Sequence, residues 1–252
     1  LYTFLKNKHF VKIMSFNSKS LVNLNKFDYV INCSINKNYI NKIYSENYDF
    51  DFKIVNKLNK NTNFIFFSSR KIYEPKANIY ENSKVNCLNN YEKNKFITEK
   101  KILKIKGNRS IILRVSNIIG FKKYNPRKVH HTYLDYLISK IKKGELILNQ
   151  NEFKDFLDIN TFSKIIDLII KRKIFGIYNV SMGKRVYLRD LNNWLLESNK
   201  NKKKLKIIKL KNNEKNQSFY LNNSKLKKKI KLNINITQLQ KECIKLSKKL
   251  FK

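Results

Sequence analysis

The hydrophobic positions of this chain fall in short apolar runs, and polar stretches with helical spacing separate them. Three runs have the length and composition of buried strands: "FDYVINCS" (27–34), "NFIFFSS" (63–69) and "SIILRVSNIIG" (110–120). Four segments have the spacing of helices: 90–106 and the stretches near 130–143, 160–172 and 187–199. Strands that alternate with helices predict the α/β class, with a doubly wound parallel sheet.

The second half of the chain has a different pattern, in which short strands are mixed with helices and polar connections. The short strands read as "ELILNQ", "GIYNVSM" and "LKIIKLK". This mixture predicts a smaller α/β lobe, and we expect the boundary near residue 122. In parallel sheets of this kind, ligands bind in the crevice outside the carboxyl ends of the strands.

Composition adds a core and a large positive charge to this picture. Hydrophobic residues make up 42% of the 252 positions, which is enough for a buried core, and the formal net charge is +37. Lysines are spread along the whole chain, and only the stretch 200–211 is dense. Lysine, asparagine, isoleucine, phenylalanine and tyrosine are abundant together, as codon bias in an AT-rich genome produces. The charge therefore predicts no specific nucleic-acid partner, although a basic nucleic-acid binder stays an alternative.

The cysteines and histidines argue against a disulfide framework or a metal site. Cys33, Cys87 and Cys243 are isolated, odd in number and without metal-ligand spacing, and only three histidines are present. This usage suits a reducing cytosol, so we expect a cytoplasmic protein without a metal. No apolar run approaches the ~18–20 residues of a membrane span, and no signal peptide is visible.

A tyrosine followed four positions later by a lysine is the candidate chemical motif, because the two side chains would share one helix face. The spacing occurs five times: Tyr2/Lys6, Tyr80/Lys84, Tyr91/Lys95, Tyr124/Lys128 and Tyr136/Lys140. Only Tyr91 follows a buried strand that ends in hydroxyl residues and begins a helix leading into another buried strand. Its position therefore favours Tyr91 and Lys95 over an ordinary surface pair.

With these elements placed, the chain resembles the extended short-chain dehydrogenase/reductase family, in its nucleotide-sugar epimerase, dehydratase and reductase branch. The resemblance rests on seven motifs in the family's order: "FDYVINCS", "NFIFFSSRKIY", "YEKNKFITEK", "LRVSNIIG", "FKDFLDINTFSKII", "GIYNVSMGKRVYLRDL" and "FYLNNSKLKKKI". It covers essentially the whole chain. It implies a Rossmann-like dinucleotide-binding domain over 1–122 and a substrate-binding lobe over 123–252.

The resemblance implies a catalytic set of Ser69, Tyr91 and Lys95. A free tyrosine titrates near ~10, and a lysine ammonium one turn away favours the phenolate and so lowers the pKa. Tyr91 would be the acid and base, Lys95 its electrostatic partner and a ligand of the nicotinamide ribose. Ser69 would polarise the reacting oxygen. The alternative for Ser69 is a strand-end hydroxyl that caps local backbone.

The same resemblance implies NAD or NADP as cofactor and a nucleotide sugar as substrate. The cofactor-binding residues would be Cys33, Ser34, Asn47, Ser68, Tyr91, Lys95 and Val115, of which Val115 replaces a frequent proline. The substrate-binding residues would be Asn117, Arg127 and Lys154. The segment "IMSFNSKS" carries no acidic residue to hold a ribose 2′-hydroxyl, which favours NADP slightly.

Two departures from the family pattern bear on function. The chain has no glycine before Gly107, so the glycine-rich phosphate turn is missing, and residues 1–17 read as the rest of a first helix followed by a second strand. We therefore expect a fragment that lacks the first strand and binds a dinucleotide poorly. Arg70 and Lys71 replace the Asp-Glu pair of the dehydratases, which disfavours a 4,6-dehydratase and leaves an epimerase or a 4-keto reductase.

Two further expectations concern activity and assembly. Glu74 replaces the usual glycine after Tyr73, so a non-catalytic family member that binds a nucleotide or a partner subunit is the main alternative. The resemblance also implies a homodimer through the helices near 38–58 and 90–106.

Overall fold

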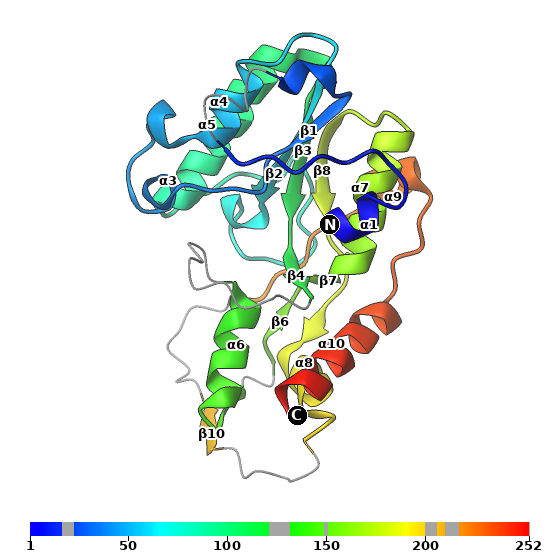
Figure 1. Cartoon of the computed structure of the whole chain (residues 1–252). Coiled ribbons are helices and arrows are strands. Elements are labelled where there is room, and N and C mark those ends of the chain that lie inside the picture. Colours follow the sequence, from blue (N-terminus) through cyan, green and yellow to red (C-terminus); the bar gives the residue numbers. More distant parts are fainter. Residues whose placement is uncertain (17–22, 121–131, 149–150, 200–205, 210–216, 252) are drawn as a thin grey trace.

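A computed structural model of the chain describes residues 1–16, 23–120, 132–148, 151–199, 206–209 and 217–251 (Figure 1). Its centre is a parallel sheet of four strands in the order β1-β2-β3-β8. The strands are β1 (Tyr29–Ile31), β2 (Asn63–Ser69), β3 (Ile111–Val115) and β8 (Gly176–Val180). The prediction of an α/β fold with a parallel sheet is confirmed.

Helices surround the sheet and build the lower part of the molecule. They are α1 (Tyr2–Leu5), α3 (Lys37–Asn41), α4 (Phe50–Val55), α5 (Asn90–Lys106), α6 (Tyr133–Lys142), α7 (Ile159–Lys171), α8 (Leu188–Leu196), α9 (Ser224–Ile230) and α10 (Ile236–Leu250). Short 3₁₀ turns are η1 (Leu24–Lys26), η2 (Glu46–Tyr48), η3 (Arg70–Ile72) and η4 (Gly107–Arg109). Among the described residues, no helix is both long and apolar enough to span a membrane.

Three strand pairs lie outside the main sheet. They are β4 (Asn117–Ile119) with β7 (Phe156–Asp158), β5 (Glu145–Leu148) with β10 (Lys206–Lys209), and β6 (Phe153–Lys154) with β9 (Val186–Tyr187). The first two pairs are parallel and the third is antiparallel. With α6, α8 and α10 they form the lower part of the molecule in Figure 1.

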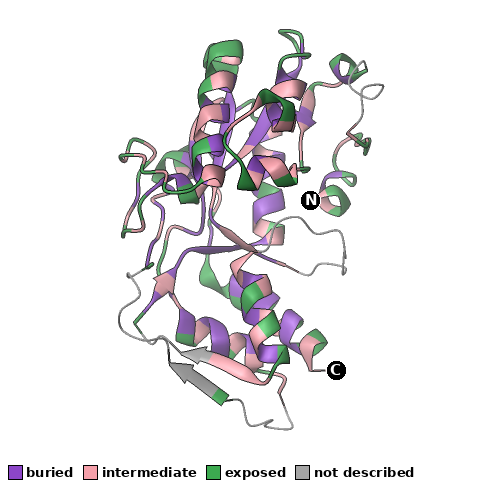
Figure 2. Cartoon of the chain, turned by 90° about the vertical axis from the view of Figure 1, so that its left-hand side faces the viewer, coloured by how far each residue is buried: buried purple, intermediate pink, exposed green. Residues whose placement is uncertain are grey.

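Alternation along the strands sends side chains into two cores, one on each face of the sheet. On β2, Phe64 and Phe66 pack with the helices α4 and α5, whereas Ile65 packs in the core that contains α7. Successive strand residues point to opposite faces, so a strand buried on both faces carries a continuous apolar run, as β2 does from Phe64 to Phe67. Figure 2 shows this burial along the strands and the inner helix faces. The sheet is therefore covered on both sides, as the doubly wound pattern predicts.

The structure corrects three details of the predicted elements. The run 110–120 is not one strand: it breaks at Ser116, whose N–H donates to the Val180 carbonyl, and the chain then pairs with β7 instead of β8. The strand in "GIYNVSM", expected in the smaller lobe, is β8 of the main sheet. The boundary near residue 122 falls outside the described residues and stays a prediction.

The third correction concerns residues 11–16, which were expected to form a strand. They belong to no sheet in the described part of the chain. Ile13 is 68% exposed, and only Val11, Met14 and Phe16 pack against the cores. A parallel strand needs a neighbour that takes its backbone N–H and C=O groups, and this segment makes no ladder with β1. The helix expected before it is present as α1.

The helix α5 begins with a reciprocal cap and ends at a glycine. The Asn89 side chain accepts a hydrogen bond from the Glu92 N–H, and the Glu92 carboxylate accepts one from the Asn89 N–H. At the other end, Gly107 has a φ of 52°, a conformation that glycine adopts without a Cβ clash. These signals explain why the predicted helix 90–106 coincides with the observed one.

The buried face of α5 is polar, and hydrogen bonds to the sheet and to neighbouring loops satisfy it. At its centre, the Glu99 carboxylate accepts hydrogen bonds from two side-chain nitrogens of Arg114 on β3. Nε donates to Oε2 at 3.2 Å and Nη2 donates to Oε2 at 2.7 Å. The Ser68 hydroxyl of β2 donates to Glu99 Oε1 at 2.5 Å. Burial alone would lower the pKa of Arg114, but the bonds to Glu99 raise it above its usual value. This network fixes α5 against β2 and β3.

The Glu99→Gln substitution tests this network. It leaves the Arg114 guanidinium buried without its counter-charge, so we expect the free energy of unfolding to fall by about 3–5 kcal/mol in urea denaturation. The control Glu46→Gln removes the exposed ion pair with Lys101 and should cost about 0–1 kcal/mol. A loss no larger than that of the control would contradict the role assigned to Glu99.

Candidate functional site

The carboxyl end of β2 carries two serines with different surroundings. Ser69 is half-buried, and its hydroxyl accepts the Lys71 N–H at 3.2 Å, which caps the turn η3. The capping alternative for Ser69 is therefore observed, and a catalytic role stays a prediction. The preceding Ser68 is buried and donates to Glu99, as described above. In the sheet, Ser69 lies opposite Val115 of β3, so these two predicted site residues are neighbours.

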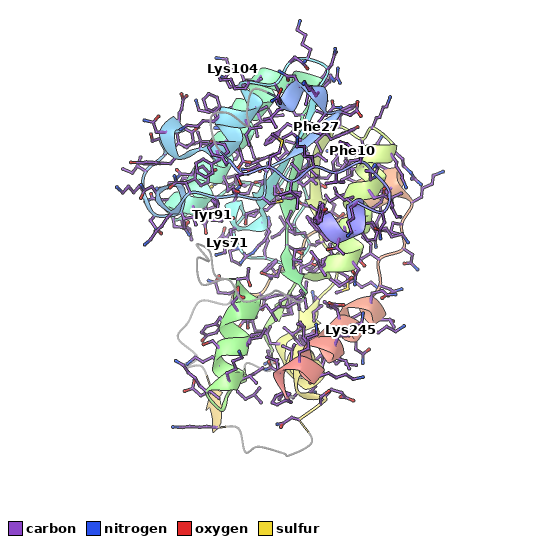
Figure 3. The ribbon with its side chains drawn as sticks, in the orientation of Figure 1. Phe10, Phe27, Lys71, Tyr91, Lys104 and Lys245 are labelled. Atoms are coloured by element: carbon purple, nitrogen blue, oxygen red, sulfur yellow. The ribbon has the colours of Figure 1, made fainter. Side chains whose placement is uncertain are left out.

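Tyr91 lies in the first turn of α5, beside the turn that follows β2. It lines a pocket of about 370 Å³ together with Ile40, Asn41, Lys71, Asn89 and Asn90. The Lys71 ammonium lies 5.9 Å from the centre of the Tyr91 ring, and Figure 3 shows the two residues side by side. Burial, followed by the charge of Arg70, lowers the pKa of Lys71. The phenol is thus half-buried in a polar pocket next to a cation.

Lys95 follows Tyr91 by one helical turn, and its ammonium is buried between β2 and α4. Its Nζ donates to the Phe67 carbonyl at 2.9 Å and lies 3.5 Å from the Asp51 carboxylate. The Asn32 amide donates to the same carboxylate at 2.8 Å. Burial raises the pKa of Asp51 to about 6, although Lys95 and Asn32 act to lower it. An ammonium has three donors, so one remains after these two contacts.

Asp51, the ion-pair partner of Lys95, is a residue that the sequence analysis missed, and the predicted cofactor residue Asn47 lies four positions before it. Asn47 lies in η2, is exposed, and its carbonyl accepts from Lys53 at 2.9 Å. It does not contact Lys95, because the first turn of α4 begins three residues later at Phe50. The two acidic residues of "DFDF" were the available signal, since a carboxylate that opens a helix beside a lysine-bearing helix is a natural ion-pair partner.

The remaining predicted cofactor residues lie at neighbouring strand ends. Cys33 and Ser34 follow β1 and are exposed, and the Ser34 N–H donates to the Asn32 side chain at 2.9 Å. Val115 ends β3 and is half-buried. The next hydroxyl, of Ser116, is buried and has no hydrogen-bond partner among the described residues. A buried hydroxyl without a partner is costly unless another group completes it, so this strand end fits a polar ligand.

The predicted substrate residues are engaged within the protein where they are described. The Asn117 amide donates to the Asp155 carbonyl at 3.0 Å. The buried Lys154 forms an ion pair with Glu152 and donates to the Gln217 carbonyl at 3.4 Å. The pKa of Lys154 is lowered overall, because burial and the charge of Arg70 outweigh the opposite effect of Glu152. Arg127 lies outside the described residues.

Beside these residues, the lobe is joined to the sheet by a carboxylate that the sequence analysis did not single out. Asp155 is fully buried and accepts the backbone N–H groups of Met182, Gly183 and Leu221 at 2.9, 3.2 and 3.1 Å. Backbone donors of this kind stabilise a buried carboxylate. Asp155 thus holds the start of β7 against the segment after β8, and it fixes Lys154 next to the end of β2.

Comparisons with known proteins identify the family and the fold. The family model for the NAD dependent epimerase/dehydratase family matches residues 5–181. A search of curated proteins finds no match.

Among solved structures, RMD from Pseudomonas aeruginosa complexed with NADPH is 16% identical, with 98% of this chain and 94% of that chain covered at a TM-score of 0.71. The UDP-N-acetylglucosamine 4-epimerase from Methanobrevibacter ruminantium M1, in complex with UDP-N-acetylmuramic acid, is 19% identical, with 89% and 77% covered at 0.69. The UDP-glucuronic acid 4-epimerase from Bacillus cereus, in complex with NAD, is 16% identical, with 92% and 78% covered at 0.67.

These likenesses establish the shared fold, and the family model carries the assignment, because it spans the sheet from α1 to the end of β8 and includes the helix of Tyr91 and Lys95. The resemblance noted in the sequence is thereby confirmed. The chain belongs to the NAD dependent epimerase/dehydratase family.

Proposed function

We propose that the protein is an NAD(P)-dependent nucleotide-sugar epimerase or 4-keto reductase, in which Ser69, Tyr91 and Lys95 act at a sugar carbon. The observation that carries the proposal is the position of Tyr91 and Lys95, one turn apart on α5 and beside the serine-ended strand β2. Family membership supports the reaction class, and the similar solved structures are complexes with NADPH, with NAD or with UDP-N-acetylmuramic acid.

The proposed chemistry divides one step between a hydride and a proton. A nicotinamide cofactor, when bound, would supply or take the hydride at the sugar carbon. Tyr91 moves the proton of the attached oxygen, and Ser69 donates a hydrogen bond to that oxygen. Lys95 lies one helical turn from Tyr91 and is proposed as its electrostatic partner. The Ser69 hydroxyl can donate this bond while it still accepts the Lys71 N–H at 3.2 Å, because a hydroxyl carries one donor and two acceptor lone pairs.

The residues present fit the nicotinamide end of the cofactor. Lys95 has one donor left for ribose hydroxyls, and the buried Ser116 hydroxyl can complete its hydrogen bonds on a polar ligand group. Cys33, Ser34 and Val115, at the ends of β1 and β3, are proposed to line the same crevice. Ser68 is proposed to act through its bond to Glu99. Asn47 is exposed in η2, so Asp51 replaces it in our proposal as the residue that contacts Lys95.

The substrate contacts and the cellular setting extend the proposal. Asn117, Arg127 and Lys154 are proposed to bind the nucleotide-sugar diphosphate, for which cations and amide donors are suited. Arg70 and Lys71 stand where the elimination chemistry of a 4,6-dehydratase needs an acid and a base, so that reaction is disfavoured. The three cysteines are free, which is consistent with a reducing cytoplasm. A homodimer through α3, α4 and α5 is the proposed assembly.

A non-catalytic family member is the second candidate. The bonds that already engage Ser69 and Lys154 favour it, because both side chains have partners within the protein. The two candidates differ in turnover, not in fold. Cofactor binding by the full-length gene product without turnover of any nucleotide sugar would favour the second candidate.

Tyr91→Phe tests the proposed acid and base. The substitution removes the phenolic proton and leaves the ring, so we expect turnover of a nucleotide sugar by the full-length gene product to fall by about 10²–10⁴-fold. Binding of the nicotinamide cofactor, followed by fluorescence, should change little.

The matched control is Tyr136→Phe, because Tyr136 and Lys140 repeat the same spacing on the half-exposed helix α6. Turnover of the control should equal that of the wild type. Equal activity of Tyr91→Phe and Tyr136→Phe would remove Tyr91 from the mechanism.

The buried carboxyl of Asp51 makes the stability of the protein depend on pH, and the Asp51→Asn substitution tests this dependence. Because burial raises the pKa of Asp51 to about 6, the folded protein holds a proton that the unfolded chain releases near ~3.9. The contribution of Asp51 to stability therefore decreases as the pH rises from about 4 to 6. Denaturation of the wild type across this range should show that decrease, and Asp51→Asn should lack it.

A further inference from the structure

Arg70 is a cation that follows directly after the serine that ends β2. The centre of its guanidinium lies 3.8 Å from the centre of the Phe219 ring. Among the described residues, it makes no hydrogen bond and no ion pair. Burial lowers the pKa of Arg70 to about 10, although the charges of Glu92 and Tyr91 act to raise it. The half-buried guanidinium therefore has five N–H donors, and its contact among the described residues is the face of the Phe219 ring.

The charges around Arg70 do not neutralise it. Lys71 is the next residue, and Lys154 lies close to Arg70. The charge of Arg70 lowers the pKa of both lysines, so these cations repel one another. The two nearby carboxylates have partners of their own. Glu152 pairs with Lys154, and Glu92 accepts the N–H groups of Leu88 and Asn89. The charge of Glu92 acts to raise the pKa of both Arg70 and Lys71 and so offsets part of their charge, but among the described residues the end of β2 keeps a net positive charge.

The place of this charge limits which anion it can bind. Arg70 is joined by one peptide bond to Ser69, which is proposed to contact the reacting oxygen of the sugar. Stacking on the fully buried Phe219 holds the plane of the guanidinium and lowers the entropy cost of using its fork. A planar carboxylate on the sugar ring matches that fork with two parallel hydrogen bonds. Hydroxyl groups at the same position would leave the buried charge without compensation.

We propose that Arg70 binds a carboxylate carried by the sugar of the substrate, so that the protein acts on nucleotide-linked acidic sugars. The inference rests on the proposed function, because it places the sugar between Ser69 and Tyr91. Phe219 orients the guanidinium, and Lys71 adds positive charge at the entrance. The diphosphate of the substrate lies on the side of the lobe residues Asn117 and Lys154 and does not need Arg70.

Two probes that share a nucleotide and a diphosphate test this inference: UDP-glucuronate and UDP-glucose. Isothermal titration with the full-length gene product should show that the wild type prefers UDP-glucuronate by about tenfold or more, the size of one charge-assisted bidentate contact. Arg70→Met keeps the contact with Phe219 and removes the charge. It should abolish this preference while the affinity for UDP-glucose changes by less than about threefold.

A matched control and a conservative variant complete the experiment. Arg185→Met removes another arginine that lies over aromatic rings, those of Phe153 and Tyr220, and it should keep the wild-type preference. Arg70→Lys keeps the charge without the fork and should retain part of the preference, which guards against a folding defect in Arg70→Met.

The outcomes separate this inference from the function on which it rests. Equal affinity of the wild type for both probes, or an equal loss of both affinities in Arg70→Met, overturns the carboxylate assignment and leaves the proposed function standing. Failure of the wild type to bind either probe overturns both.

Discussion

The buried ion pair between Glu99 and Arg114 is the interaction on which the arrangement of this site depends. A helix that packs on a sheet usually does so with apolar side chains, but α5 presents a polar face. Each buried polar group on that face therefore needs a hydrogen-bond or ion-pair partner at a fixed position, because an unpaired charge in the core costs several kcal/mol. Arg114 of β3 and Ser68 of β2 provide the partners for Glu99. This requirement fixes how α5 is rotated, and so it fixes where Lys95 and Tyr91 lie, one and two turns earlier on the same face.

The electrostatics of the site follow from the same geometry. At the inner end, the Lys95 ammonium is held by the Asp51 carboxylate and the Phe67 carbonyl, one helical turn along α5 from Tyr91. At the outer end, Arg70 and Lys71 leave a positive charge that the described residues do not neutralise. Tyr91 lies between Lys95, which is paired with Asp51, and Lys71, whose ammonium lies beside the Tyr91 ring. This arrangement suits the proposed reaction, in which a proton leaves a sugar oxygen and an anionic sugar is bound.

The sequence was sufficient for the elements that local signals define. The strand over 63–69 and the helix over 90–106 agree with the structure, because a continuous apolar run and a reciprocal Asn89–Glu92 cap are properties of neighbouring residues. Features that depend on distant partners were not predictable in this way. Residues 11–16 have a strand-like composition and no strand to pair with, and β8 joins the main sheet only through its register with β3. Likewise, Asp51 is 44 residues from Lys95 in sequence, so nothing local indicates their ion pair.

The most direct measurement of the central claim, hydride transfer at a sugar carbon, is the fate of solvent deuterium. The full-length gene product would be incubated in D₂O with a nicotinamide cofactor and a nucleotide sugar, and the product would be examined by NMR and mass spectrometry. The hydrogen at the reacting carbon comes from the cofactor and Tyr91 handles only the oxygen-bound proton, so the account predicts a product whose reacting carbon carries no solvent deuterium. Deuterium at that carbon would contradict it, because it would require a proton removed directly from carbon.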